Sequence, residues 1–261
     1  MVINIKKIKY VTLFLLYLGV FLFVAFIIPI KRPYNEIKDS ESIINEQDKI
    51  LKEYESVCNK IIPFIVKAKV EVDGKVYQGE VIEDKGNGQR YCLKIDDGLY
   101  WYDSYYVTIL DIKEEPIDYL TDYEIELFIN LSNYTSNTPY FIYVDIYRNQ
   151  TYVLKKENNY FYLEKRLNCS TGELTTPTKR GTYKIVNKGK SFIGRSKDYI
   201  CYNYLTYSGS YLLHSFPYSL DNKVLDDRVN DRVSNGCVRF SLLDSKYLYD
   251  VITIGTTICL Y

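Results

Sequence analysis

The run YVTLFLLYLGVFLFVAFIIPI at residues 10–30 constrains the chain more than any other feature, because it is apolar and carries no charge. A helix of about 20 apolar residues crosses a bilayer. A cleavable signal peptide would have a shorter apolar core and a small-residue cleavage site, and neither is present. We therefore expect an uncleaved single transmembrane helix. Basic residues flank both ends, so the positive-inside rule leaves the orientation open, and the short N-terminal tail favours a folded part outside the cell.

The charge balance and the cysteine spacing argue against two classes of protein. Lys+Arg and Asp+Glu both number 33, so no net field attracts nucleic acid, which we do not expect as a partner. The six cysteines show no CxxC or CxH spacing, so we do not expect a zinc site. We expect most of these cysteines to be unpaired and buried. Histidine occurs once, at His214.

After the apolar run, the chain divides into four further segments. Residues 34–62 are polar with apolar side chains at seven-residue spacing, which predicts a helical stalk. Residues 63–112 contain short runs of alternating apolar and polar side chains that are separated by turn residues. This pattern predicts a small SH3-like, barrel-like β domain. We expect its aromatic run LYWYDSYY to fill a small core, and the alternative is that the run offers aromatic faces to a polymer. Residues 113–138 predict a helical connector, and 139–261 predict mostly strands with one short helix after Ser241. Within the last segment, Arg148-Asn149-Gln150 lies between two apolar runs and predicts a hairpin.

Cys237, in the stretch VSNGCVRF, is the candidate nucleophile. On its own a cysteine is more often a buried apolar residue. A free thiol is only a few per cent thiolate near neutral pH and needs a base, and His214 is the one imidazole that the chain offers. His214 ends a predicted strand, and a polar loop separates it from Cys237. Two strand ends joined by an exposed loop can bring two such residues together.

The neighbours of Cys237 have candidate roles of their own. Gly236 lacks a Cβ, so the backbone can present the N–H groups of Gly236 and Cys237 to an oxyanion. Ser234 and Asn235 can brace this turn, and we assign Asn235 to the oxyanion hole as well. Arg239 either binds a substrate carboxylate or forms a structural salt bridge. We place Arg239 and Ser234 at the substrate-binding site.

The order of these residues argues against papain-like peptidases, and the motif before the cysteine argues against sortases, whose His, Cys, Arg order the chain shares. Papain-like peptidases place Cys before His, and sortases carry Thr-Leu-x-Thr-Cys before a strand. Instead, HSFPYS followed by SNGCVRF resembles the signature of L,D-transpeptidases of the YkuD type, in which a His opens a loop that ends in Ser/Thr-x-Gly-Cys-hydrophobic-Arg/Asn. STG at 170–172, TPTKRGTYKI at 176–185 and the closing DSKYLYDVITIGTTICLY resemble further landmarks of that family. The resemblance covers residues 139–261.

The resemblance implies a β-sandwich catalytic domain at 139–261 that needs no metal or organic cofactor. Cys237 is then the nucleophile, His214 the base, and Ser215 the residue whose carbonyl orients the imidazole. Asn235 departs from the pattern, since many members have His there, and Asn can donate a hydrogen bond but cannot titrate. The family's tyrosine near the oxyanion hole falls on one of four candidates: Tyr202, Tyr204, Tyr207 and Tyr211.

The function that the resemblance implies is a membrane-anchored L,D-transpeptidase that faces the cell wall and acts on the stem peptides of peptidoglycan. It transfers the acyl group of the third residue of a tetrapeptide stem to an amine of another stem through a thioester, which makes a 3–3 cross-link. Three alternatives stay open at this stage. They are an L,D-carboxypeptidase on the same fold, a sortase-like anchoring transpeptidase and an inactive wall-binding protein.

Overall fold

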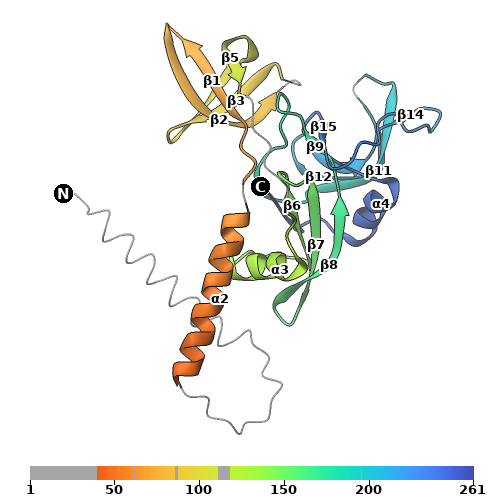
Figure 1. Ribbon diagram of the computed structural model, residues 1–261. Coiled ribbons are helices and arrows are strands. Elements are labelled where there is room, and N and C mark those ends of the chain that lie inside the picture. Colours follow the sequence, from red (N-terminus) through yellow and green to blue (C-terminus); the bar gives the residue numbers. More distant parts are fainter. Residues whose placement is uncertain (1–39, 62, 86–87, 111–117, 195) are drawn as a thin grey trace.

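The computed structural model describes residues 40–61, 63–85, 88–110, 118–194 and 196–261 (Figure 1). The predicted transmembrane segment lies outside these ranges, so it stays a prediction. Among the helices within them, none is both long and apolar enough to span a membrane. The described chain is mostly β, with a small N-terminal sheet domain and a larger C-terminal sheet domain.

Two helices precede the larger domain and pack on each other. Helix α2 (Ser40–Lys60) lies within the predicted stalk, and helix α3 (Asp122–Leu131) within the predicted connector. Thr121 caps α3 in a reciprocal capping box with Glu124, which satisfies N–H groups that a helix start leaves unpaired. The Lys60 ammonium lies 2.8 Å from the Glu124 carboxylate, so the end of α2 is tied to the start of α3.

The small domain is one five-stranded antiparallel sheet in the order β4-β3-β2-β1-β5. A two-residue turn at Asp73-Gly74, with positive φ at both residues, joins the first two strands as tight hairpins require. Trp101 and its neighbours Leu99 and Tyr100 are exposed on β4, so the expectation that this aromatic run fills the core is wrong for these side chains. The strands are β1 (Lys67–Val72), β2 (Lys75–Lys85), β3 (Arg90–Ile95), β4 (Gly98–Asp103) and β5 (Val107–Ile109), with a 3-10 turn, η1 (Ser104–Tyr106), before the last.

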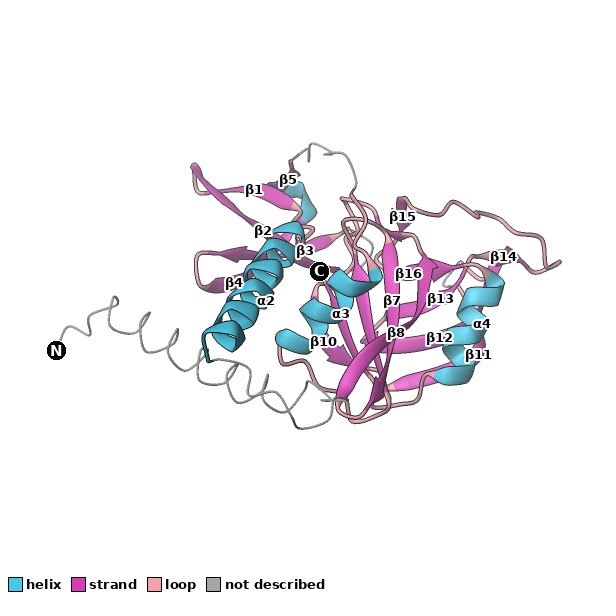
Figure 2. Cartoon of the chain, turned by 60° about the horizontal axis from the view of Figure 1, so that its bottom comes forward, coloured by secondary structure: helices cyan, strands magenta, loops and turns pink. Residues whose placement is uncertain are grey.

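The larger domain is a sandwich of two main sheets (Figure 2). One has the order β10-β17-β6-β7-β8, and the other has the order β11-β12-β13-β16 with β14 beside β12. A short parallel pair, β15-β9, forms a separate two-stranded sheet, and an isolated bridge between Ser170 and Arg239 joins it to β16. The strands of the first sheet are β6 (Tyr140–Asp145), β7 (Gln150–Glu157), β8 (Tyr160–Asn168), β10 (Gly181–Lys184) and β17 (Thr257–Leu260). The others are β9 (Thr171–Gly172), β11 (Asn187–Ile193), β12 (Tyr199–Ser208), β13 (Tyr211–Ser215), β14 (Tyr218–Ser219), β15 (Arg232–Ser234) and β16 (Val238–Phe240).

The two sheets share one hydrophobic core that extends into the small domain. Ile142 and Val153 from the first sheet and Leu213 from the second are fully or almost fully buried in it. Val66 and Leu93 of the small domain belong to the same cluster. Burial of apolar area stabilises such a core by about 25 cal/mol per Å². The two domains therefore pack as one body rather than as independent modules.

The predicted short helix of the sandwich is α4 (Leu242–Val251), which packs against the β11–β13 sheet (Figure 2). Ser241 is its N-cap, and the Ser241 hydroxyl accepts a hydrogen bond from the Asp244 amide at 3.1 Å. The hairpin expected at 148–150 is also present, because β6 pairs antiparallel with β7 and Asp145 lies opposite Gln150. Local sequence signals therefore located both elements correctly.

Candidate active site

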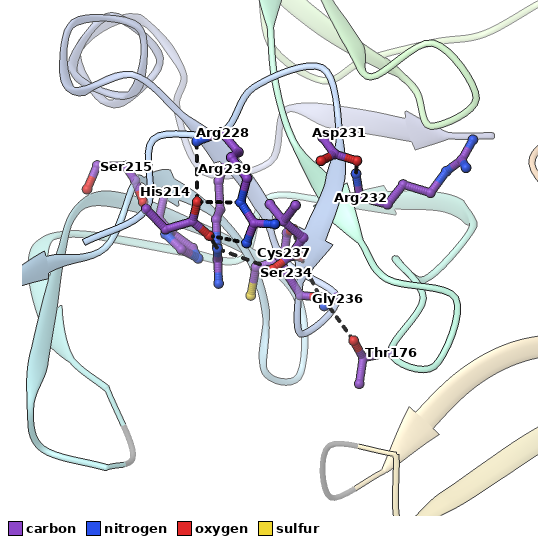
Figure 3. A network of polar contacts seen from close by, with 12 residues as sticks. Thr176, His214, Ser215, Arg228, Asp231, Arg232, Ser234, Gly236, Cys237 and Arg239 are labelled. Atoms are coloured by element: carbon purple, nitrogen blue, oxygen red, sulfur yellow. Dashed lines mark hydrogen bonds and ion pairs between the residues drawn. The ribbon is translucent and has the colours of Figure 1, made fainter. Parts of the chain in front are cut away.

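Parallel pairing of two short strands brings the candidate nucleophile and base together. β13 lies beside β16, with Leu213 opposite Val238 and His214 opposite Arg239. Cys237 directly precedes β16, so it lies one position before this pairing begins. Figure 3 shows Cys237, His214 and Arg239 gathered at these strand ends. The two residues, which are 23 positions apart in the chain, thus lie in the same region because their strands are neighbours.

His214 is held in one orientation and one tautomer. Its Nδ1 lies 2.6 Å from the carbonyl oxygen of Ser215, which is the orienting contact that the resemblance implies. A carbonyl can only accept a hydrogen bond, so Nδ1 carries the proton and Nε2 keeps its lone pair. The ring of Phe192 packs edge-on against the imidazole, with centroids 5.3 Å apart. The second ring nitrogen is therefore the atom that can accept a proton.

Burial keeps His214 neutral at ordinary pH. The side chain is 5% exposed. Desolvation lowers the pKa of His214 to about 4, the nearby Arg239 charge acts in the same direction, and the hydrogen bond to Ser215 opposes both. A neutral imidazole can take a proton from a thiol, whereas an imidazolium cannot.

The turn that carries Cys237 is braced by Ser234. The Ser234 hydroxyl donates to the carbonyl oxygen of Cys237 at 2.5 Å and accepts from the Gly236 amide at 3.1 Å. Gly236 has φ +97°, and a Cβ at this position would lie 2.8 Å from Cε1 of Tyr211. Glycine is therefore required here both by backbone conformation and by the close approach of the tyrosine ring.

The Thr-Pro-Thr segment holds this turn from the other side. Thr176 donates from its hydroxyl to the carbonyl of Ser234 at 2.9 Å (Figure 3). The Thr178 hydroxyl accepts from the Gly172 amide at 2.8 Å, so the segment folds back over β9. The carbonyl oxygen of Pro177 faces Gly236. A landmark about 60 residues before the nucleophile in the sequence thus contacts the nucleophile's own turn in space.

The other predicted site residues, Arg239, Ser234 and Asn235, lie in the same region but differ in burial and in hydrogen-bond partners. Arg239 forms an ion pair with Asp226 at 3.2 Å, as the structural alternative anticipates, while its buried Nε has no hydrogen-bond partner among the described residues. Ser234 is buried and serves the turn. Asn235 is exposed beside a pocket. The substrate-binding roles of Arg239 and Ser234 and the oxyanion role of Asn235 stay predictions.

The six cysteines are all free thiols, and Cys237 differs from most of them in exposure. Four are buried: Cys92, Cys169, Cys201 and Cys259. Burial raises the pKa of Cys169 and of Cys201 to about 12, which makes them poor nucleophiles. Cys237 and Cys58 are only half-buried. Within the described ranges, no group of three or more His, Cys, Asp or Glu is placed to hold a metal ion.

Two functional features escaped prediction from the sequence. Tyr211, one of four tyrosine candidates, is the one whose ring lies against Gly236, and its hydroxyl bonds Asp84 of the small domain at 3.2 Å. Beside this contact lies a pocket of about 400 Å³ between the two domains. Its lining residues are Glu83, Asp84, Lys85, Trp101, Lys179, Ser208, Gly209, Ser210, Tyr211 and Asn235. We call it the interdomain pocket.

The family of the larger domain follows from comparison with known proteins. Residues 139–259 match the family model of the L,D-transpeptidase catalytic domain, YkuD. This part of the chain therefore belongs to the YkuD family of L,D-transpeptidase catalytic domains, whose members act on peptidoglycan stem peptides. No curated protein matches the chain significantly.

Several solved structures are similar to the chain. A fused Zn-dependent amidase/peptidase/peptidoglycan-binding domain-containing protein from Clostridium acetobutylicum is 28% identical, with a TM-score of 0.47, over 54% of this chain and 59% of that one. An L,D-transpeptidase from Mycobacterium smegmatis is 14% identical, with a TM-score of 0.40, over 74% of this chain and 76% of that one. An L,D-transpeptidase from Stackebrandtia nassauensis is 17% identical, with a TM-score of 0.38, over 53% of this chain and 65% of that one. The match to the Clostridium protein thus spans about three fifths of its length.

Proposed function

We propose that the chain is a membrane-anchored L,D-transpeptidase that cross-links peptidoglycan stem peptides outside the cell membrane. The observation that carries the proposal is the placement of Cys237 beside His214 with the imidazole fixed by the Ser215 carbonyl at 2.6 Å. A half-buried thiol next to a neutral, oriented imidazole is the arrangement that nucleophilic acyl transfer needs. It supports an active enzyme over a wall-binding protein that has lost its chemistry.

The proposed reaction runs in two acyl-transfer steps. Nε2 of His214 takes the thiol proton, and the Cys237 sulfur attacks the carbonyl of the third residue of a tetrapeptide stem. The bond to the terminal D-Ala breaks, and His214 returns the proton to the leaving amine, which leaves a thioester. The amine of a second stem then attacks the thioester, passes a proton to His214 and releases the thiol, so that a 3–3 cross-link remains.

The turn around Cys237 supplies the donors for the oxyanion in this proposal. They are the backbone N–H groups of Gly236 and Cys237. The Gly236 N–H already donates to the Ser234 hydroxyl at 3.1 Å, a long bond that it has to share with the oxyanion. Ser234 thereby sets the direction of this N–H before the oxyanion forms.

Intact-mass measurement after exposure to a carbapenem tests the acyl-enzyme step. The wild-type chain should gain the mass of one acyl adduct, because a carbapenem carries a carbonyl that a thiolate attacks. Cys237→Ala should gain none. Cys58→Ala removes the other half-buried thiol and is the matched control, which should be acylated like the wild type. An adduct that persists in Cys237→Ala would contradict the assignment of the nucleophile.

Product analysis separates the proposed reaction from its hydrolytic alternative. Incubation of the chain with tetrapeptide muropeptides should give cross-linked dimers, because an amine competes for the thioester. Tripeptides without dimers would instead show that water is the acceptor and that the enzyme is an L,D-carboxypeptidase.

Location outside the membrane is part of the proposal, since peptidoglycan lies there. It is supported by the uncharged run at residues 10–30. Protease added to intact wall-stripped cells should degrade the domain at 139–259, whereas protection until the membrane is permeabilised would contradict this orientation.

A further inference from the structure

The interdomain pocket lies directly beside the proposed nucleophile. The hairpin turn between β12 and β13 forms one wall, and the end of β2 with Trp101 of β4 forms the other. The Cys237 thiol donates to the carbonyl of Ser210, a residue of this lining, at 3.6 Å. A pocket of about 400 Å³ is within the size range of ligand sites. The small domain therefore contributes four of the ten residues that line this cavity, and the lining residue Ser210 contacts the proposed reacting sulfur.

The order of residues along the strands places the pocket and the base on opposite sides of Cys237. Tyr211 and Asn235, which line the pocket, precede the paired positions of β13 and β16. His214, opposite Arg239, lies further along the same strands. Cys237 lies between these two levels. A substrate bound across the sulfur thus has one half toward the pocket and the other half toward His214.

The chemistry decides which half of the substrate enters the pocket. In the proposed reaction His214 protonates the leaving amine and later deprotonates the attacking amine, so both amines occupy the His214 side. The acyl half of the donor stem must then extend away from His214, which is toward the pocket. That half contains the third residue, whose side chain carries the same kind of amine that the acceptor stem uses for attack.

The pocket presents charges that suit such a peptide. Glu83 and Asp84 follow each other at the end of β2 and both line the pocket, and Asp84 is held by the Gly88 amide at 2.9 Å and the Tyr211 hydroxyl at 3.2 Å. Glu83 forms an ion pair with Lys179 of the larger domain. Two lysines, Lys85 and Lys179, balance the two carboxylates around the cavity. A ligand that carries both an ammonium and a carboxylate matches this lining better than a ligand of one charge.

We propose that the small β domain forms the binding site for the acyl-donor stem, with Glu83 and Asp84 recognising the side-chain ammonium of its third residue. This inference rests on the proposed function. It gives the small domain a role in substrate specificity rather than in spacing alone. Glu83 and Asp84 are specificity residues here, because they bind the donor and take no part in the proton transfers.

The test compares two tetrapeptide donors with the full-length chain. One has the free side-chain amine at its third residue and the other has that amine acetylated, and the acceptor in both reactions is the same tripeptide stem, which has a free amine but no D-Ala to release. The wild type should process the free-amine donor with a kcat/KM about tenfold higher, since one desolvated charge contact is worth roughly that factor. The double variant Glu83→Gln, Asp84→Asn should bring the ratio close to one, chiefly through KM. The ratio cancels any general loss of activity in the variant.

A matched control replaces an exposed carboxylate on β1 of the same domain. Glu71 is exposed and does not line the pocket, so Glu71→Gln should keep the wild-type ratio of kcat/KM between the two donors. Equal processing of both donors by the wild type would overturn the inference without any substitution, and so would a double variant that keeps the preference. Failure of the wild type to process either donor and to be acylated by a carbapenem would instead overturn the proposed function, and the inference with it.

Discussion

At the scale of single residues, the candidate site combines a buried candidate base with a more accessible candidate nucleophile. His214 is 5% exposed and neutral, and its proton lies on Nδ1 because the Ser215 carbonyl accepts it. Cys237 is half-buried and is thus the more accessible of the two side chains. Burial keeps His214 in the neutral form, which has a lone pair free to accept a proton. It also raises the free energy of the protonated form. The same side chain therefore links the chemistry to the pH dependence of stability.

The stability of the protein should fall between pH 6.5 and pH 4 because of His214. The folded-state pKa of about 4 lies below the ordinary value of 6.5, so the unfolded chain binds a proton first as the pH falls. The contribution is fully present above pH 6.5, is lost as the pH falls toward 4, and amounts to about 3 kcal/mol. Urea unfolding across this range should show a steeper loss for wild type than for His214→Gln. Parallel curves would show that His214 titrates normally in the folded chain.

At the scale of elements, three short segments meet around one turn. Cys237 directly precedes β16, the Thr176–Thr178 segment bonds Ser234, and the start of β13 places Tyr211 against Gly236. None of these segments has a hydrophobic core of its own. The geometry of the nucleophile therefore depends on hydrogen bonds between elements and on the absence of a side chain at Gly236.

Gly236→Ala should lower both stability and acylation. The alanine would have to adopt a φ near +97°, and its Cβ would lie 2.8 Å from the Tyr211 ring. We therefore expect the free energy of unfolding to fall by about 2 kcal/mol and the turn to be displaced. Carbapenem acylation, followed by mass, should slow at least about tenfold. Gly74→Ala is the matched control, because it also has positive φ but meets no atom within 4 Å. It should lose up to about 1 kcal/mol and keep the wild-type acylation rate. Equal effects of the two substitutions would show that the Tyr211 contact is unimportant.

At the scale of the whole molecule, buried polar contacts fasten the preceding helices and the small domain to the sandwich. Arg148 is 3% exposed and pairs with Asp145 at 2.9 Å. The same guanidinium donates to the carbonyl of Lys60 at the end of α2 at 2.7 Å and to that of Asp118 at 2.6 Å. Arg180 and Glu80 add an ion pair between the domains at 3.0 Å. Stalk, connector and sandwich thus share one charged group.

Arg148→Met should destabilise the protein by about 3–5 kcal/mol, because it leaves Asp145 buried without its partner. Hydrogen exchange should accelerate at the end of α2 and near Asp118, where two backbone carbonyls lose their donor. Arg90→Met removes an ion pair with Asp103 whose side chains are 47% and 65% exposed, and it should change stability by less than about 1 kcal/mol. A similar small effect for Arg148→Met would contradict its role as a fastening residue.

Short sequence windows predicted the features whose physics is local. The N-cap at Ser241 depends on a hydroxyl and an amide three residues apart, and the hairpin at 148–150 depends on turn residues between two apolar runs. The pairing of Cys237 with His214 was predicted from residue types, because the chain has one imidazole and acyl transfer by a thiol needs one. The exposure of Trp101 was predicted wrongly, since an aromatic residue in an alternating strand gives no sign of which face is covered.

The sequence by itself determined the candidate reactive side chains, the family of residues 139–259 and the strands that carry them, because these depend on residue chemistry and on local periodicity. Only the tertiary structure decided what surrounds them. Asp84 and Tyr211 are 127 positions apart, and their contact exists because two sheet domains share one core. Such docking is the sum of many weak contacts between distant segments, and no short window of sequence contains that sum. The interdomain pocket beside Cys237 is its product.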